Sequence, residues 1–238
     1  MFLYITLFFQ NLLGFSPLEA GLRTLPVTMP ILLVSPLSGR LTARVPARLL
    51  LGTGLAFVTL GLLLMGNLSD SSPWTALLPG QILAGIGIGL ATPALASTAV
   101  GVVAPQLSGM ASGANNTARQ LGLATGIAGL GSIFQSKIES TLTPLVTGMS
   151  ASSHVHELAR AVASGGTGRA VQAVPPDDRV KVANAAHHAF VTGFNIIALV
   201  SVAVAAVGCV AGYALVRSRD FVPPAATPAP VPPEPARA

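Results

Sequence analysis

The sequence predicts an all-α integral membrane protein with about six transmembrane helices in one bundle, the first of them truncated. Of its 238 residues, 51% are hydrophobic and only 9% are charged, and the mean hydropathy is +0.69. Soluble domains usually carry about 25% charged residues. The apolar residues also gather into uncharged runs of about 20 residues or more, the length that crosses a hydrocarbon core of ~30 Å.

The first apolar stretch, Met1–Gly14, is too short to span a membrane. As a helix it would reach about 21 Å. It lacks the basic region and the small-residue cleavage site of a signal peptide. We therefore expect the second half of a spanning helix, in a chain that is a fragment or a shortened gene product.

Four further spans follow from length and hydropathy, at Thr24–Gly39, Leu49–Leu68, Leu77–Val100 and Ala189–Val216. Arginines at both ends of the first of these can snorkel and so extend it. Two of the four spans carry residues that favour close helix packing or a hinge. In Thr24–Gly39 these are Pro30 and Pro36, with Pro26, and in Leu77–Val100 they are Gly85, Gly89 and Pro93.

The remaining span, Gly109–Phe134, is the most informative because it carries polar residues at membrane depth. At about 100° per residue, one arc of roughly 140° contains all four of them, Asn115, Asn116, Arg119 and Gln120. The glycines beside that arc, Gly122, Gly126 and Gly129, would admit a neighbouring backbone. An intramembrane arginine costs several kcal/mol, so it normally faces water or a buried partner. The face indicates a solute pathway or, alternatively, a structural hydrogen-bond network within the bundle.

Short-loop charges predict the orientation of a multi-pass protein of the cell membrane. Arg40, Arg44 and Arg48 share one short connection, and Arg217 and Arg219 follow the last span, so both chain ends are expected in the cytoplasm. We divide the chain into a bundle over residues 1–221, with an outer loop at about 135–187, and a disordered cytoplasmic tail over 222–238 with seven prolines. Within the loop, a short amphipathic helix is expected at Val155–Ala163 and a helix start after Pro176.

Several classes of function find no support in the residues. The net charge of +5 comes without a basic cluster, so no nucleic acid is expected. We predict no cofactor and no metal, because Cys209 is the only cysteine and the His154/His156 pair has no third ligand nearby. An enzyme is disfavoured because the spans hold no nucleophile–base or paired-carboxylate constellation. Gln10, Asn11 and Gln81 are interpreted as interfacial side chains at helix ends.

Five segments, taken in order, resemble the carboxy-terminal half of major facilitator superfamily transporters. Within that superfamily, they are most similar to the fourteen-helix drug:proton antiporters, which are multidrug efflux proteins. They read FFQNLLGFSPLEAGLRTLP, PLSGRLTARVPAR, LPGQILAGIGIGLATPAL, GMASGANNTARQLGLATGIAGLGSIF and HHAFVTGF. The resemblance covers nearly the whole chain except the outer loop and the tail. It implies two helix bundles with solute moving between them, and proton-coupled export of small amphipathic molecules.

The resemblance also assigns roles to residues. Gly39, Arg40, Arg44 and Arg48 match a cytoplasmic loop motif that latches helix ends together, although the arginines alone would also mark topology. The polar residues of the Gly109–Phe134 span match a patch that lines the central cavity. No Asp or Glu lies inside any predicted span, so the coupling carboxylate is expected in a missing amino-terminal half, fused or separate. The expected partners are thus the lipid bilayer, that half, a small-molecule substrate and protons; the alternative is a non-transporting membrane protein.

Overall fold

The computed structural model describes residues 1–147, 154–172 and 174–216, and every regular element in these ranges is a helix. The predicted all-α class is therefore confirmed. The predicted tail at 222–238, and with it Arg217 and Arg219, lies outside the described residues.

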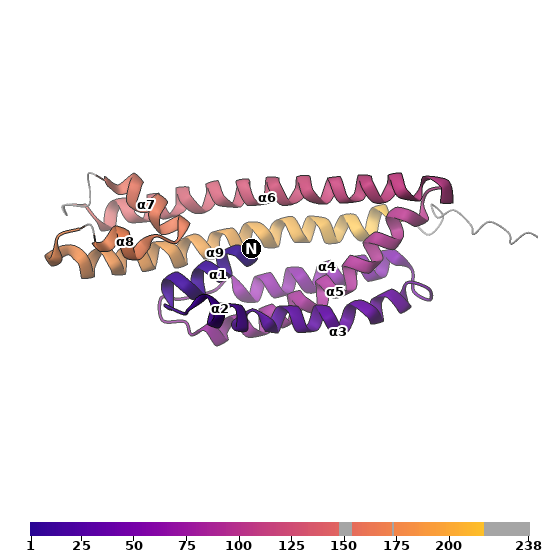
Figure 1. Cartoon of the computed structure of the whole chain (residues 1–238), viewed down its shortest axis with the longest axis horizontal. Helices are drawn as coiled ribbons and strands as arrows, with labels where there is room; N and C mark the ends of the chain where they lie inside the picture. The colour runs from indigo at the N-terminus through magenta and orange to yellow at the C-terminus, as the bar shows by residue number, and fades with distance from the viewer. Residues whose placement is uncertain (148–153, 173, 217–238) are drawn as a thin grey trace, which may run out of the picture.

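The chain begins with a short apolar helix, α1 (Phe2–Leu7), which continues directly into a π-helical turn, η1 (Phe8–Leu12). The elements that follow are α2 (Pro17–Arg23), α3 (Leu25–Leu41), α4 (Ala47–Met65), the 3-10 turn η2 (Trp74–Leu77), α5 (Leu78–Gly101), the 3-10 turn η3 (Pro105–Leu107), α6 (Ser108–Leu145), α7 (Val155–Ser164), α8 (Thr167–Gln172) and α9 (Pro176–Leu215). Figure 1 shows α6 and α9 running the full length of the molecule beside the shorter helices.

Fewer helices than predicted are apolar enough to cross a membrane by length and composition. Within the described residues, α4, η2 with α5, and α9 meet that criterion, and a fourth span results if α2 and α3, which meet at 44°, count as one. The first helix is short, as expected. Helix α6 is long enough to cross a membrane but is not among these candidates, because the amides, Arg119 and many glycines lower its hydropathy.

Helix α3 continues through Pro30 and Pro36, and its bend lies elsewhere. The 44° change of direction falls at Thr24, between α2 and α3 and ahead of all three prolines. A capping box starts α2: Glu19 N donates to Ser16 Oγ at 3.3 Å, and Ser16 N donates to Glu19 Oε2 at 2.9 Å. The bend therefore comes from the join between two helices.

Glycines let α3, α4 and α5 approach one another at backbone distance. A Cβ placed on Gly54 would lie 2.8 Å from Gly87 O, and one on Gly61 would lie 2.7 Å from Gly80 O, so α4 and α5 touch along two turns. On the other side of α5, a Cβ on Gly85 would overlap the Val27 carbonyl of α3. Small residues at helix contacts are the usual means of packing in lipid.

The two longest helices are longer than a hydrocarbon core is thick. The 38 residues of α6 and the 40 of α9 correspond to about 57 and 60 Å, roughly twice the thickness of the hydrocarbon core. Their projecting ends enclose α7 and α8 (Figure 1). The described residues of the segment 135–187, expected as an outer loop, are therefore largely a packed helical unit, which we call the outer lobe, because apolar side chains of α6, α7 and α9 bury one another there.

Two predicted features inside the outer lobe are confirmed. Helix α7 occupies Val155–Ser164 and ends at Gly165, whose φ of +91° is left-handed. Helix α9 starts at Pro176, with Asp177 and Asp178 in its first turn.

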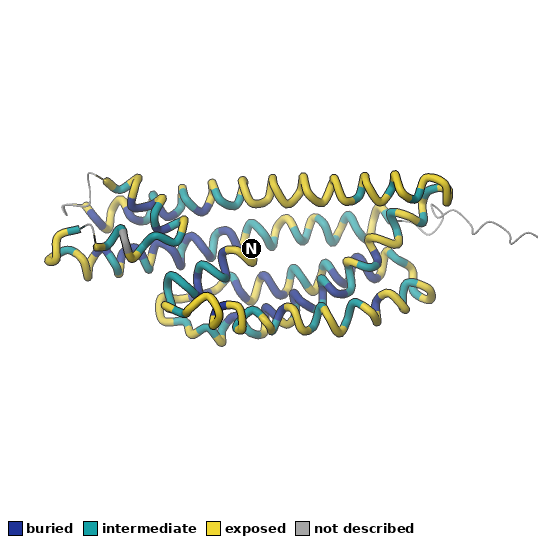
Figure 2. The backbone as a smooth tube through the Cα atoms, viewed as in Figure 1, coloured by how far each residue is buried: buried dark blue, intermediate teal, exposed yellow. Residues whose placement is uncertain are grey.

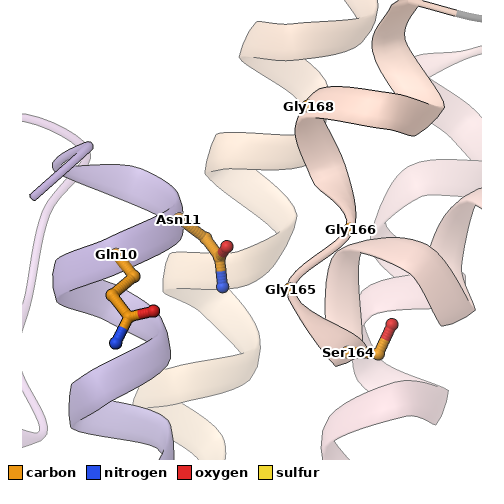
Figure 3. Close-up of a pocket in the computed structure, with 6 residues that line it drawn as sticks. All are labelled: Gln10, Asn11, Ser164, Gly165, Gly166 and Gly168. Carbon is orange, nitrogen blue, oxygen red and sulfur yellow. The ribbon is translucent and has the colours of Figure 1, made fainter. Parts of the chain in front are cut away.

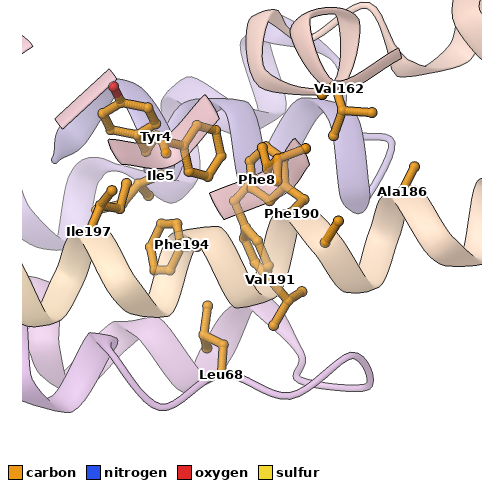
Figure 4. Packing of buried hydrophobic residues seen from close by; sticks show 14 of the residues in the cluster. Tyr4, Ile5, Phe8, Leu68, Val162, Ala186, Phe190, Val191, Phe194 and Ile197 are labelled. Atoms are coloured by element: carbon orange, nitrogen blue, oxygen red, sulfur yellow. The ribbon is translucent and has the colours of Figure 1, made fainter. Parts of the chain in front are cut away.

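The main core joins α1 and η1 to α6 and α9 (Figure 4). Phe8 packs against Phe194 with ring centroids 5.8 Å apart, and Phe134 meets Phe190 edge-on at 5.1 Å. Tyr4 meets Phe134 at 4.9 Å. These contacts anchor the carboxyl half of α6 and leave its amino half outside the core.

Replacing Gly85 by alanine should destabilise the bundle by about 1–3 kcal/mol, because the added methyl group must displace the α3 backbone at Val27. Gly122→Ala is the matched control: nothing lies within 4 Å of its Cβ position, and alanine favours a helix over glycine by up to ~1 kcal/mol. The measurement is SDS-induced unfolding of the purified chain in mixed micelles. Equal stability of the two variants would contradict the packing role of Gly85.

Candidate functional site

The predicted polar face lies on the amino-terminal half of α6, and it is open. Asn116, Arg119 and Gln120 are exposed and Asn115 is half-buried. Every residue from 116 to 129 is exposed, so the helix is uncovered around its circumference there (Figure 2). The glycines expected to receive a neighbouring helix, Gly122, Gly126 and Gly129, have no atom within 4 Å of their Cβ positions.

Packing of α6 begins only in its carboxyl half. Phe134, Ile138 and Leu142 are buried, four residues apart, and they face α9 and the outer lobe. The same helix is thus anchored at one end by aromatic and aliphatic side chains and stands free at the other. The polar arc is therefore part of the exposed surface of the chain.

Arg119 dominates the electrostatics of this surface. Among the described residues, the Arg119 guanidinium forms no ion pair, and neither do the three arginines of the α3–α4 connection. At the membrane depth that the sequence predicts for Arg119, a cation without a carboxylate requires water or a partner surface. The arc therefore combines one positive charge with three amides, which can donate to and accept from a polar solute.

The predicted latch residues lie together at the end of the molecule opposite the outer lobe. Arg40, Arg44 and Arg48 are exposed, as is Gly39. Leu41 and Val45 pack in the same small cluster as Val216, which follows α9. The arginine-rich connection and the end of the last helix therefore share one end of the bundle.

The structure corrects the interpretation of Gln81 as an interfacial residue. Its side chain is only 1% exposed inside the bundle, and neither amide atom has a hydrogen-bond partner among the described residues. A second amide that sequence reasoning missed is Asn195, whose Nδ2 donates to Leu68 O at 2.8 Å and whose Oδ1 accepts from Leu68 N at 3.0 Å. The only signal for either residue is a lone amide within an apolar run.

The outer end carries histidine–carboxylate pairs. His188 Nδ1 lies 2.8 Å from Asp70 Oδ2, and His156 Nδ1 lies 3.2 Å from Glu139 Oε1. The first pair ties α9 to the α4–α5 connection, and the second ties α7 to α6. Within the described ranges, no group of three or more His, Cys, Asp or Glu side chains could hold a metal ion.

Comparison with known proteins gives one family and a consistent set of relatives. Residues 1–127 match the sequence profile of the Major Facilitator Superfamily. The chain is 35% identical over 144 residues to the multidrug resistance protein Stp of Mycobacterium tuberculosis, an alignment covering 60% of this chain and 27% of that protein. It is 33% identical over 160 residues to the multidrug efflux pump LfrA of Mycolicibacterium smegmatis (63% and 31% covered).

A third relative is the puromycin resistance protein pur8 of Streptomyces alboniger, 36% identical over 137 residues, with 56% of this chain and 27% of that protein covered. The alignments thus span only about a third or less of the length of these relatives. The names of all three relatives refer to drug resistance or drug efflux.

Cysteine labelling should show that the polar arc of α6 meets water. In a Cys209→Ala background, Asn116→Cys and Arg119→Cys should react at least tenfold faster with a membrane-impermeant maleimide than Leu121→Cys does. Leu121 lies on the opposite side of the helix at about 100° per residue, and a thiol reacts as the thiolate, which requires water. Labelling of opened vesicles measures the rates. Equally slow labelling at all three positions would contradict a water-facing arc.

Proposed function

The chain belongs to the major facilitator superfamily, and on that premise we propose that it is the carboxy-terminal half of a drug-efflux transporter. The observation that carries this proposal is the polar arc of α6, exposed on a helix that is long enough to cross a membrane. The three named relatives export or confer resistance to small molecules, which supports the same class of activity. The proposed substrates are small amphipathic solutes.

The proposed pathway runs along the α6 arc. Asn115, Asn116 and Gln120 would form hydrogen bonds with polar groups of the solute, and Arg119 would attract its acceptor atoms or pair with a carboxylate across the pathway. In alternating access, one helix bundle rocks against another around a site near the bilayer midplane. The open polar face of α6 would form one side of such a site, and the second bundle would form the other.

Proton coupling is proposed to depend on the other half. Residues 25–65, 78–134 and 189–215, which hold the membrane-crossing parts of the described helices, contain no Asp or Glu. A proton carried through the membrane needs a group that titrates in the pathway, usually a carboxylate or a histidine. The partner half would therefore supply both the titrating group and the second wall of the cavity.

The arginine-rich connection is proposed to act as the latch at the cytoplasmic end. Arg40, Arg44 and Arg48 are exposed and carry three positive charges within one short connection. In one conformation they would pair with carboxylates of the partner half, and in the other they would be solvated. Such contacts bias a two-state equilibrium in proportion to the difference in their strength between the states.

A non-transporting membrane protein is the second candidate. The observation that favours it is the open amino half of α6: without a partner, one bundle has only one wall of a pathway. The two candidates differ in what the chain does when its partner is supplied.

Replacing Arg119 by alanine, in this half joined to an amino-terminal half, should reduce ethidium export at least tenfold while leaving membrane insertion unchanged. The reason is that an exposed side chain holds no packing contact but supplies the only charge of the arc. Export is measured as fluorescence loss from preloaded cells, and insertion by membrane fractionation. Leu121→Ala, on the opposite side of α6, is the control; unchanged export by the Arg119 variant would refute its role.

The chain expressed alone should export no ethidium, and export should appear when it is joined to the coding sequence upstream of its Met1 or co-expressed with it. Reading that upstream sequence in the same frame is the first step. Export by the chain alone would contradict the half-transporter proposal, and no export with any upstream segment would favour the non-transporting alternative.

A further inference from the structure

The arginines of the α3–α4 connection lie at a membrane surface, whichever way the chain is oriented. The helices on either side of the connection, α2 with α3 and then α4, both have the length and hydropathy of a membrane span. A connection between two spans stays out of the hydrocarbon, because its backbone polar groups need water. Arg40 lies in the last turn of α3 and Arg48 in the first turn of α4, so both charges are at the level of the lipid headgroups.

The chain turns tightly after α3 and brings Arg44 close to Arg40. Arg44 N and Val45 N both donate to the carbonyl oxygen of Leu41, at 2.9 and 2.8 Å. Arg44 therefore lies about one helical turn from Arg40 along the chain. Leu41 and Val45 pack against buried residues of α4 and α5, which fixes the connection to the bundle. The backbone that carries the arginines is thus held in place while their side chains are exposed.

The arginine end of the bundle carries positive charge, and the carboxylates lie elsewhere. No Asp or Glu occurs in residues 20–69, 71–138 or 179–216. The acids that the structure describes belong to α2, the α4–α5 connection and the outer lobe, and they are Glu19, Asp70, Glu139, Glu157, Asp177 and Asp178. Asp220 and Glu234 lie in the tail, outside the described residues. Three positive charges on one exposed connection therefore attract an anion from the surroundings.

Apolar side chains lead from Arg40 into the membrane along one side of α3. Leu37, Leu33 and Met29 lie about one, two and three turns before Arg40, and at about 100° per residue all three fall within roughly 60° of it around the helix. Their exposed fractions are 54%, 73% and 52%. A row of exposed aliphatic side chains that ends at a cation matches a phospholipid, in which acyl chains lead to a phosphate group.

We propose that the α3–α4 connection binds an anionic phospholipid, with its phosphate group on Arg40 and Arg44 and an acyl chain along Leu37 and Leu33. A guanidinium can bind two phosphate oxygens through parallel N–H···O bonds, which favours arginine at phosphate sites. Arg48 adds a third charge at the same surface. The ammonium group of a zwitterionic headgroup would lie among like charges, so an anionic headgroup is expected to bind more tightly. This binding goes beyond the proposed latch, because it requires neither a partner half nor transport.

The test is native mass spectrometry of the full chain, purified in detergent micelles and titrated with lipid. The probe is dioleoyl phosphatidylglycerol, compared with dioleoyl phosphatidylcholine, which has the same acyl chains and a phosphate but no net charge. The parent chain should bind phosphatidylglycerol at least tenfold more tightly. Arg44→Gln should weaken that binding about fivefold, the factor that one basic side chain near a membrane surface contributes. Arg40→Gln, Arg44→Gln and Arg48→Gln together should weaken it at least twentyfold.

The matched control removes three positive charges from the outer lobe, by Lys137→Gln, Arg160→Gln and Lys181→Gln together. This variant has the same net charge as the triple arginine variant, but its α3–α4 connection is intact. It should bind phosphatidylglycerol within twofold of the parent chain. The comparison therefore separates binding at the connection from attraction by the overall charge.

Three outcomes would overturn the proposal. Equal affinity of the parent chain for the two lipids would show that the headgroup charge is not recognised. An equal loss of binding in the outer-lobe control would show that net charge, and not the connection, attracts the lipid. Displacement of phosphatidylglycerol by millimolar inorganic phosphate would assign the arginines to a free anion. Because binding is measured on the chain alone, failure of the efflux proposal would leave this result unaffected.

Discussion

Backbone-to-backbone contact at glycine is the interaction on which the rest of this structure depends. Lipid gives apolar helices no hydrophobic reason to associate, so close packing must hold them together. Gly54 against Gly87 and Gly61 against Gly80 join α4 to α5, and Gly85 brings α3 to the other side of α5. Helix α9 then lies along α4, where Cys209 Sγ donates to Gly52 O at 3.2 Å. Helix α6 packs mainly against α9.

Because α6 lies at the edge of this bundle, its two halves have different surroundings. Its carboxyl half reaches the aromatic core formed with α1, η1 and α9, and its amino half has no neighbour on the polar side. Three amides and an arginine on an uncovered helix would be poorly solvated by hydrocarbon. In the proposed half-transporter, a second bundle would turn this surface into one wall of a pathway.

The two ends of the bundle differ in chemistry as well as in shape. At one end, three exposed arginines crowd a short connection. At the other, α7 and α8 pack against the ends of α6 and α9, histidine–carboxylate pairs join the elements, and a cavity lies between η1 and the α7–α8 segment (Figure 3). The outer lobe thus shares one apolar core with α1, η1 and the rest of α9.

Local pattern determined much of this protein: the helical class, the short first helix, α7, the start of α9 at Pro176 and the polar arc of α6 all follow from hydropathy, spacing and capping, which act within a few turns of chain. Membership of the superfamily is also legible in the sequence, through segments that resemble those of its members. Only the tertiary structure decided that residues 135–187 pack into a lobe, that Gln81 is buried and that Asn195 holds Leu68 across 127 residues of sequence. These outcomes depend on which distant surfaces meet, and no periodicity along one helix records its neighbour.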